Sequence, residues 1–498
     1  MKKDRFTRFL ETIPAFISWF MIIVPLIFAF FLPKYLIYFL IVFTFYWLFR
    51  SVLFSINIVR GYIKYSKTKK INWLNKIKKE KSEEFEKIYH AIIFVVYKEP
   101  EELVLRSIKT YIDSNYPKEK IIFVLGTEEA AGDYAEKLKN TVKKEFGKEF
   151  FAFIATTHPK NIPGELKSKS ANATWAAREL KKFLDQKNIS AENVISHNFD
   201  CDTSVEKQYF ACVTYRFLSL GKEERIKTAY QPFHVYSNNI WDAPAISRIV
   251  AITGTFVALF NTFRQNRLHN FSSRSDCFQS LVNIDYWATD VIPEDSRQYY
   301  TSFFYYKGDY KVTPIYLPLH MDAVLADTYK KTILNQYRQL RRWAWGVVDF
   351  PFLVKKSIKD KKIPWPKKFY QIYQLTENHL LWSVTPIYLT VLGWTPFLFH
   401  PDFRDTVLGQ NYPTVIKSIL NFASMGWFVM IYLNFLLLPP RPKHRTKFRY
   451  IEMIYQWALA PLVSIFFSSV AALDSQTRLA LGKYLEYQVT EKAIKMRK

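Results

Sequence analysis

A run of 20 residues without a charged side chain, residues 13–32, constrains the fold more than any other feature of this sequence. Twenty apolar residues in a helix match the thickness of the hydrocarbon core of a bilayer. The run is longer than the core of a secretory signal and lacks a small-residue cleavage site, so we expect a retained anchor. After a short break at Pro33-Lys34, residues 35–59 are again mostly apolar. The two runs predict a transmembrane helical hairpin over residues 1–60.

Basic residues flank this predicted hairpin on both sides. Between Arg60 and Lys87 there are ten Lys or Arg against four Glu, and four more basic residues lie among the first eight. Loops rich in Lys and Arg stay in the cytosol, so both flanks are expected there. The formal net charge of +26 is typical of proteins that bind nucleic acid or an anionic membrane surface. Because the basic runs adjoin apolar ones, we expect membrane lipids as partners and no nucleic acid.

A basic linker, residues 61–88, leads to a region of different character, residues 89–345. Short apolar runs rich in β-branched and aromatic residues alternate there with helical patterns. This alternation predicts βαβ units and a mostly parallel sheet, a Rossmann-like α/β domain in the cytosol between transmembrane helices. Ligands of such sheets bind beyond the carboxyl ends of the strands. The predicted strands are residues 91–97, 121–125, 151–155 and 194–199, and the predicted helices are residues 101–112, 133–144 and 171–184.

The C-terminal part is again apolar. Residues 346–375 mix lysines with aromatic and aliphatic side chains, which is typical of a segment lying along a membrane interface. About three spans follow within residues 376–475, and residues 476–498 form a basic tail. Three spans would place the tail outside, whereas its charge favours the cytosol, so the number of spans and the side of the tail stay open. The expected spans are about residues 380–401, 418–440 and 453–473.

Two carboxylates one residue apart, Asp200 and Asp202, follow the fourth predicted strand. At a strand end both can reach one divalent cation, and hard oxygen ligands favour Mg²⁺ or Mn²⁺. Such triplets are also common in turns, because Asp is favoured there. The triplet alone therefore does not establish a metal site.

A second acidic pair, Glu294-Asp295, follows Pro293. A carboxylate beside a hydroxyl can accept its proton during a transfer reaction. Acidic residues after a proline are also typical of the first turn of a helix, which is the competing interpretation.

Basic and aromatic residues supply candidate ligands for phosphate and sugar. Lys169, with Asn172, opens a predicted helix, where a phosphate is bound favourably. Gln339-Leu340-Arg341-Arg342-Trp343 offers guanidinium groups for a diphosphate and an aromatic face for a sugar. The competing interpretation is an interfacial basic-aromatic helix. The cysteines Cys201, Cys212 and Cys277 form no CxxC pair, and we expect buried, reduced thiols.

In their order along the chain these motifs resemble the inverting, cellulose-synthase-like family 2 of membrane glycosyltransferases, which have a GT-A fold. The resemblance covers residues 89–345 and the flanking helices. The motifs that carry it are Val95-Val96-Tyr97-Lys98-Glu99-Pro100, Lys169-Ser170-Ala171-Asn172, Asp200-Cys201-Asp202, Glu294-Asp295 and Gln339-x-x-Arg342-Trp343.

The resemblance implies a role for each motif. It places the catalytic base at Asp295. Binding of the metal, Mg²⁺ or Mn²⁺, falls to Asp200 and Asp202. The family's nucleotide-contacting Asp after the second strand is absent, and Glu128 is the expected substitute. The remaining expected residues are Lys169, Asp200, Asp202 and Arg342 for the donor diphosphate and Glu294, Gln339 and Trp343 for the acceptor.

The implied function is metal-dependent transfer of a hexose from a nucleotide-sugar donor to a hydroxyl of a polysaccharide or glycolipid. It would occur at the cytosolic face of the cell membrane, in polysaccharide biosynthesis, with single or repeated addition left open. One alternative is a degenerate nucleotide-sugar sensor or scaffold. Another is a membrane transporter with a cytosolic regulatory domain, which the near absence of charges within the spans disfavours.

Overall fold

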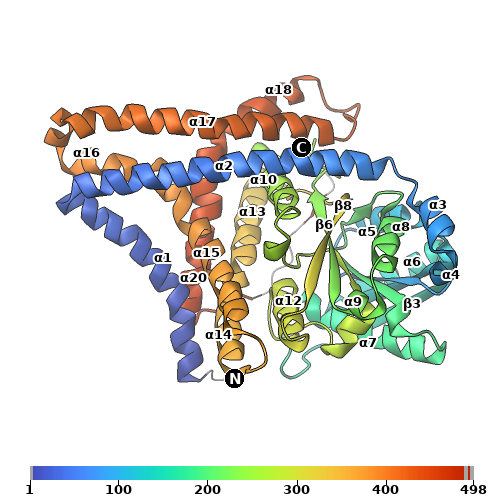
Figure 1. Cartoon of the computed structure of the whole chain (residues 1–498). Coiled ribbons are helices and arrows are strands. Elements are labelled where there is room, and N and C mark those ends of the chain that lie inside the picture. The colour runs from blue at the N-terminus through green and yellow to red at the C-terminus, as the bar shows by residue number, and fades with distance from the viewer. Residues whose placement is uncertain (1–3, 487–491, 494–498) are drawn as a thin grey trace.

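The computed structural model describes residues 4–486 and 492–493. Helices α1 (Arg5–Phe31) and α2 (Pro33–Lys69) come first and meet at Leu32. The side chain of Asp4 caps α1 by accepting a hydrogen bond from the backbone N–H of Thr7, and Pro33 begins α2 at a position where its missing N–H costs nothing. With 37 residues, α2 continues beyond its apolar part and reaches across the α/β domain (Figure 1).

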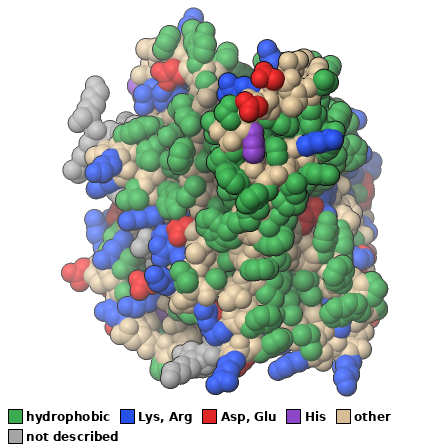
Figure 2. All heavy atoms as spheres, turned by 90° about the vertical axis from the view of Figure 1, so that its left-hand side faces the viewer, with side chains coloured by type: hydrophobic (Ala, Val, Ile, Leu, Met, Phe, Trp, Pro, Cys, Tyr) green, Lys and Arg blue, Asp and Glu red, His purple; other side chains and the backbone are tan. Residues whose placement is uncertain are grey.

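In the described part of the chain, four helices are long and apolar enough to cross a membrane. They are α1, α2, α17 (Val407–Leu437) and the composite helix Phe448–Ala480. The predicted span at residues 380–401 is not among them. Helix α15 (Trp365–Thr390) ends there, and short helical turns follow as far as Asp405. Hydrophobic side chains cover much of the face that the long apolar helices form (Figure 2).

An eight-stranded sheet forms the centre of the α/β domain, with the strand order β3-β2-β1-β4-β7-β6-β8-β5. The first four of these strands are parallel, and β7 is antiparallel to both of its neighbours, β4 and β6. The predicted α/β class is confirmed. The strands are β1 (Tyr89–Val95), β2 (Ile121–Glu128), β3 (Ala152–His158), β4 (Val194–Phe199), β5 (Ser204–Val205), β6 (Thr228–Val235), β7 (Arg274–Cys277) and β8 (Lys311–His320).

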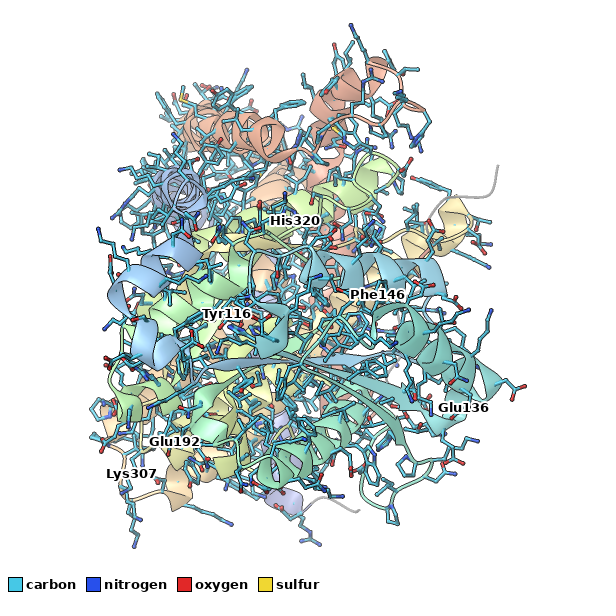
Figure 3. All side chains as sticks on the ribbon, turned by 90° about the vertical axis from the view of Figure 1, so that its right-hand side faces the viewer. Tyr116, Glu136, Phe146, Glu192, Lys307 and His320 are labelled. Atoms are coloured by element: carbon cyan, nitrogen blue, oxygen red, sulfur yellow. The ribbon has the colours of Figure 1, made fainter. Side chains whose placement is uncertain are left out.

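Helices cover both faces of this sheet (Figure 3). On one face α5 and α8 bury Leu103, Ile108 and Phe210 against the strands, and on the other α7 buries Ala176 and Leu180. The helices of the domain are α3 (Trp73–Glu80), α4 (Ser82–Phe85), α5 (Glu101–Ile112), α6 (Asp133–Phe146), α7 (Lys169–Gln186), α8 (Tyr209–Leu218), α9 (Lys222–Ile226), α10 (Ala245–Asn261), α11 (Phe278–Asn283), α12 (Glu294–Tyr305) and α13 (Tyr329–Ala344).

The chain then returns to the helical part through α14 (Asp349–Lys359) and α15. The composite helix Phe448–Ala480 is irregular, because a π-helical segment, Ser464–Ser469, interrupts it. Its last segment, α20, packs against α1 and α13, so it joins the helical part to the domain. The remaining helices are α16 (Thr395–Phe399), α18 (Phe448–Tyr455), α19 (Ala460–Val463) and α20 (Val470–Ala480).

Candidate functional site

The carboxyl ends of β1, β2 and β4 meet the start of α7. A Cβ atom added at Gly126 of β2 would lie 2.5 Å from Oδ1 of Asn172 and 2.9 Å from a methyl group of Val95. Only glycine therefore allows the first turn of α7 to approach the sheet so closely. This approach places Lys169, at the start of α7, beside the end of β4.

Asp200 lies at the centre of a polar cluster. It accepts hydrogen bonds of 2.6 Å from Nζ of Lys169 and from the hydroxyl of Ser272. Burial opposes ionisation of Asp200, but Lys169 and Lys492 outweigh it and hold the pKa of this carboxyl below its usual range. The backbone N–H of Asp200 donates to Ser273, which fixes the turn after β4.

Asp202 is 1% exposed and is contacted from two directions. Nζ of Lys492, near the C-terminus, lies 2.5 Å from its Oδ1. The backbone N–H of Asp322, just after β8, donates to its Oδ2 at 3.0 Å. The Asp322 carboxylate in turn pairs with Arg106 of α5 at 2.6 Å. Burial and the neighbouring Asp202 raise the pKa of Asp322.

The acidic pair begins α12, as the competing interpretation of the sequence also had it. The guanidinium of Arg274, fully buried on β7, donates to Oδ1 of Asp295 and lies 3.2 Å from Asp276. Burial, and then the charge of Asp295, raise the pKa of Glu294 to about 7. The charges of Asp200, Glu294 and Asp295 together outweigh burial and raise the pKa of Lys169, so the Lys169, Asp200 and Glu294-Asp295 motifs share one electrostatic environment.

The Gln-x-x-Arg-Trp motif lies on the last two turns of α13. Gln339 accepts a hydrogen bond from Gln336 at 3.1 Å, and Trp343 is 38% exposed. Arg342 follows Arg341 on this helix and is partly exposed. Arg341, the residue between the motif positions, pairs with Asp474 of α20 at 3.1 Å.

The end of α13 lies next to the start of α12. Asp349, fully buried, accepts a 2.7 Å hydrogen bond from Nε of Arg297 and another from Ser296. Ile292, just before α12, shares an apolar cluster with Trp345, just after α13. These contacts bring the acidic pair and the Gln-x-x-Arg-Trp motif to the same side of the domain.

Glu128 ends β2, where the nucleotide-contacting residue was expected. Its carboxylate lies 3.0 Å from Nδ1 of His158 at the end of β3, and Nε2 of His158 lies 2.9 Å from Glu165. Burial opposes protonation of His158, but the two glutamates outweigh it and raise its pKa. Glu128 is therefore held in place by a neighbour instead of extending freely into solvent.

The residues present fit a divalent cation bound together with a phosphate ligand. The described residues contain no group of three or more His, Cys, Asp or Glu side chains that could hold a metal alone. Mg²⁺ usually takes one or two carboxylates and fills its remaining positions with water and phosphate oxygens. Asp200 and Asp202 would supply the carboxylates, and the ammonium group now beside Asp202 marks a position favourable for positive charge.

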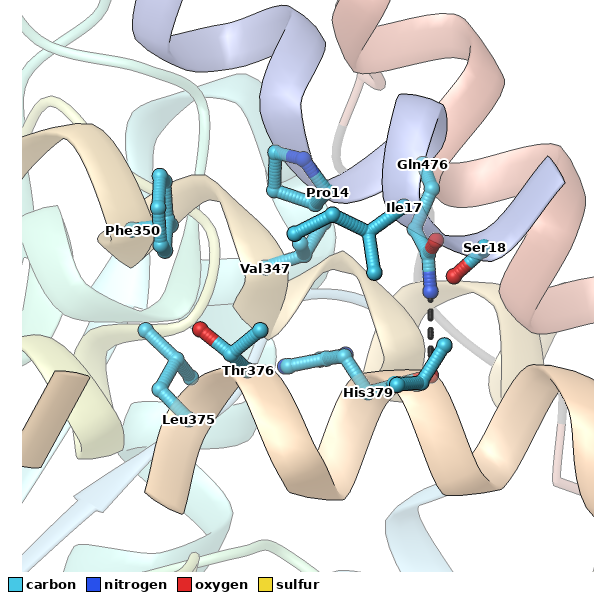
Figure 4. Close-up of a pocket in the computed structure, with 10 residues that line it drawn as sticks. Pro14, Ile17, Ser18, Val347, Phe350, Leu375, Thr376, His379 and Gln476 are labelled. Atoms are coloured by element: carbon cyan, nitrogen blue, oxygen red, sulfur yellow. Dashed lines mark hydrogen bonds between the residues drawn. The ribbon is translucent and has the colours of Figure 1, made fainter. Parts of the chain in front are cut away.

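A small cavity lies elsewhere, among α1, α14, α15 and α20 (Figure 4). Its lining includes Ile17, Phe350 and His379, and Gln476 donates a hydrogen bond to the backbone of His379 beside it. Its volume of about 10 Å³ corresponds to about one water molecule. The cavity is thus too small for a nucleotide or a sugar.

The sequence interpretation missed several residues of this cluster. Ser272, Ser273 and Arg274 lie in a polar stretch, and no local pattern in the sequence marks this stretch as a buried strand. Lys492 was counted only as part of a basic tail. All three cysteines are buried and free, as predicted.

No family model matches the chain, and no curated protein matches its sequence. Among solved structures, it is similar to the mannosyltransferase PcManGT from Pyrobaculum calidifontis in complex with GDP-Man and Mn²⁺. The identity is 14%, the TM-score is 0.40, and the match covers 86% of this chain and 99% of the other. Residues 1–349 of S. aureus TarS match with 9% identity and a TM-score of 0.36, over 80% and 94% of the two chains. GalNAc-T7 with UDP, GalNAc and Mn²⁺ matches with 10% identity and a TM-score of 0.34, over 58% and 57%.

Proposed function

We propose that this protein is a membrane-embedded, inverting glycosyltransferase that moves a hexose from a nucleotide-sugar donor to a hydroxyl acceptor. The proposal rests on the side chains of this chain. The observation that carries it is the convergence of Lys169, Asp200 and Glu294-Asp295 at the carboxyl ends of the strands, where α/β sheets bind ligands.

In this proposal each group has a role in the transfer. Glu128 binds the nucleotide base, and Lys169 and Arg342 offset the charge of the diphosphate. A Mg²⁺ or Mn²⁺ ion held by Asp200 and Asp202 would supply further positive charge at the diphosphate. Asp295 accepts the proton of the acceptor hydroxyl through the carboxylate oxygen that Arg274 does not hold.

The acceptor oxygen then attacks the anomeric carbon from the side opposite the diphosphate. As the new glycosidic bond forms, the bond from the anomeric carbon to the donor phosphate oxygen breaks, and the configuration inverts. The leaving group is the nucleoside diphosphate. Glu294, Gln339 and Trp343 contact the acceptor, which is a polysaccharide or a glycolipid, at the membrane face.

The arrangement of the helices supports a multi-pass protein with its catalytic domain in the cytosol. With four spans, two before and two after the domain, both termini lie on the same side of the membrane. The basic N-terminus, linker and tail then all lie on the cytosolic side. This removes the conflict that three C-terminal spans create, and we propose the cell membrane as the location.

The test is release of nucleoside diphosphate by the purified, detergent-solubilised protein from a panel of nucleotide sugars. Mn²⁺ or Mg²⁺ is added, with lipid and oligosaccharide acceptors. We expect release from one donor, dependent on metal, lost in Asp202→Ala and retained in Asp290→Ala, an exposed carboxylate outside the cluster. Donor binding without release from any donor would contradict transfer and favour a nucleotide-sugar sensor.

A further inference from the structure

The C-terminal segment of the chain reaches into the candidate metal site. Lys492 and Leu325 form a parallel β-bridge, and the backbone N–H of Ala493 donates a 2.8 Å hydrogen bond to the carbonyl of Leu325. Leu325 itself is fully buried, three residues after Asp322, which contacts Asp202. The segment is therefore fixed by its backbone, and the position of Lys492 does not depend on its side chain alone.

The ammonium group of Lys492 lies on the oxygen that a cation would need. Its Nζ is 2.5 Å from Oδ1 of Asp202, while the side chain is only 16% exposed. The charges of Asp202 and Asp200 outweigh burial and raise the pKa of Lys492, so it stays charged at neutral pH. A divalent ion bound through Asp202 Oδ1 lies about 2.1 Å from that oxygen. The ion and the ammonium group cannot both occupy that position.

We propose that the segment carrying Lys492 is an intrachain inhibitory ligand, which competes with the divalent cation and the donor diphosphate for Asp202. The inference rests on the proposed function, because it takes Asp202 as a metal ligand. In the closed state Lys492 neutralises Asp202, and the backbone at Ala493 is paired with Leu325. Binding of the cation with a nucleoside diphosphate displaces Lys492 and opens the backbone pairing at Leu325.

The contact has a consequence that can be measured without turnover. Two ligands that exclude each other weaken each other's binding by the same factor. Removing the Lys492 charge should therefore tighten Mn²⁺ binding, and adding Mn²⁺ should release the tail. A Lys492 ammonium group that helped to bind the donor would have the opposite effect, because its removal would weaken binding.

The first measurement is titration of the full-length protein in detergent with Mn²⁺, following free Mn²⁺ by electron paramagnetic resonance. The titration is done with Mn²⁺ alone and then with UDP or GDP. We expect Lys492→Ala, and a chain ending at residue 486, to bind Mn²⁺ at least about 5-fold more tightly than the wild type. Lys483→Ala should bind as the wild type does, because Lys483 is an exposed lysine of the same tail.

Two other outcomes overturn the inference in distinguishable ways. Equal affinity of wild type and Lys492→Ala, with binding lost in Asp202→Asn, would keep the metal site and reject the inhibitory tail. Weaker binding in Lys492→Ala would also reject it and make Lys492 a donor-binding group. Lack of Mn²⁺ binding in every variant, with UDP and with GDP, would reject the metal site of the proposed function and the inference with it.

A second readout follows the tail itself. In the closed state the backbone N–H of residue 493 is hydrogen-bonded to Leu325, so a cysteine in place of Ala493 reports on this contact. A cysteine in place of Lys483 lies in the exposed part of the tail. The native cysteines are buried, so background labelling by a maleimide is low. Labelling of Ala493→Cys should accelerate several-fold on addition of Mn²⁺ with UDP or GDP, and labelling of Lys483→Cys should not change. Unchanged labelling of Ala493→Cys in the presence of bound Mn²⁺ would overturn the displacement.

Discussion

At the residue scale, three acidic side chains of the candidate site each have a basic partner. Lys169 contacts Asp200, Lys492 contacts Asp202 and Arg274 contacts Asp295. For Glu294 no ion-pair partner lies among the described residues, and it is 6% exposed. Burial and the charge of Asp295 therefore oppose ionisation of this carboxyl group and raise its pKa.

The pKa of Glu294 differs between the folded and unfolded states, so the stability of the protein depends on pH. A carboxyl group whose pKa rises from about 4.5 unfolded to about 7 folded binds its proton more tightly in the folded state. Stability is then lost as pH rises from about 4.5 to about 7, by up to about 3 kcal/mol. Glu294→Gln, which does not ionise, should exceed the wild type in thermal stability by an amount that grows over this range and is constant above it.

The measurement is the midpoint of thermal unfolding of both proteins between pH 5 and pH 8. The matched control is Glu223→Gln, which changes an exposed glutamate of α9 and should follow the wild type at every pH. A difference between Glu294→Gln and wild type that does not vary with pH would contradict the raised pKa.

Asp295 carries a second prediction at this scale. Asp295→Asn keeps an oxygen for Arg274 but removes the basicity, so transfer should fall by about 10²–10⁴-fold while donor binding is retained. Initial rates of nucleoside diphosphate release with acceptor and calorimetric binding of the donor check the two parts. Asp290→Asn is the control, and appreciable transfer by Asp295→Asn would remove Asp295 as the base.

At the scale of the element, Gly126 is the residue at which strand β2 packs against the first turn of helix α7. Gly126→Ala places a methyl group within 2.5 Å of Asn172, so either β2 or the first turn of α7 must move. We expect a loss of about 1–3 kcal/mol in unfolding free energy, the usual cost of overpacking, and weaker donor binding because Lys169 moves with α7.

Gly254→Ala is the matched control for this change. A Cβ there would meet only Tyr236, at an ordinary 3.5 Å, and alanine favours a helix interior, so stability should be unchanged or higher. Denaturant unfolding of the two variants and the wild type checks the pair. Equal stability of Gly126→Ala and wild type would show that α7 can shift without cost.

The elements differ in how far the sequence predicted them. Strands β1 to β4 and the helices between them follow apolar runs and helical spacing, and the predicted bounds of β4, residues 194–199, agree with the observed ones. β7 was missed because its Arg-Ser-Asp-Cys sequence is polar, and β8 because it contains two prolines. Polar strands are stabilised by tertiary partners such as Asp295 for Arg274, which periodicity cannot reveal.

The same limit applies to the site. Motifs close in sequence, such as Asp200 and Asp202, could be singled out, whereas the proximity of Asp200 to Lys169 and Glu294 became visible only in the structure. The contact of Lys492 with Asp202 joins residues 290 positions apart, at a tail of ordinary basic composition. A local pattern carries no information on such a pairing.

At the scale of the whole molecule, the four candidate spans predict which loops share a side of the membrane. Single cysteines at Asp4 and Lys483 should react with a membrane-impermeant maleimide only from the cytosolic side. A cysteine at Asp405, between α16 and α17, follows only α1 and α2, an even number of the four spans, and should therefore also react from the cytosolic side. All three positions are exposed.

The measurement is labelling of sealed inside-out and right-side-out vesicles. The unsubstituted protein is the control, since its cysteines are buried. Reaction of the Asp4 and Lys483 cysteines from opposite sides would contradict an even number of spans and support the three C-terminal spans predicted from the sequence.

Helix α2 connects the domain to the other long apolar helices. It runs unbroken for 37 residues, roughly 55 Å, packs along α17 and then against α10 and β8 (Figure 1). At Gly61 a Cβ would lie 2.6 Å from the side chain of Leu259, so the helix is seated tightly on the domain. In the proposed membrane-embedded transferase, this rigid helix would set a constant height of the site above the lipid headgroups. An acceptor would then have to present its hydroxyl at that height, and a bilayer of different thickness would tilt helix and domain together instead of changing the distance between them.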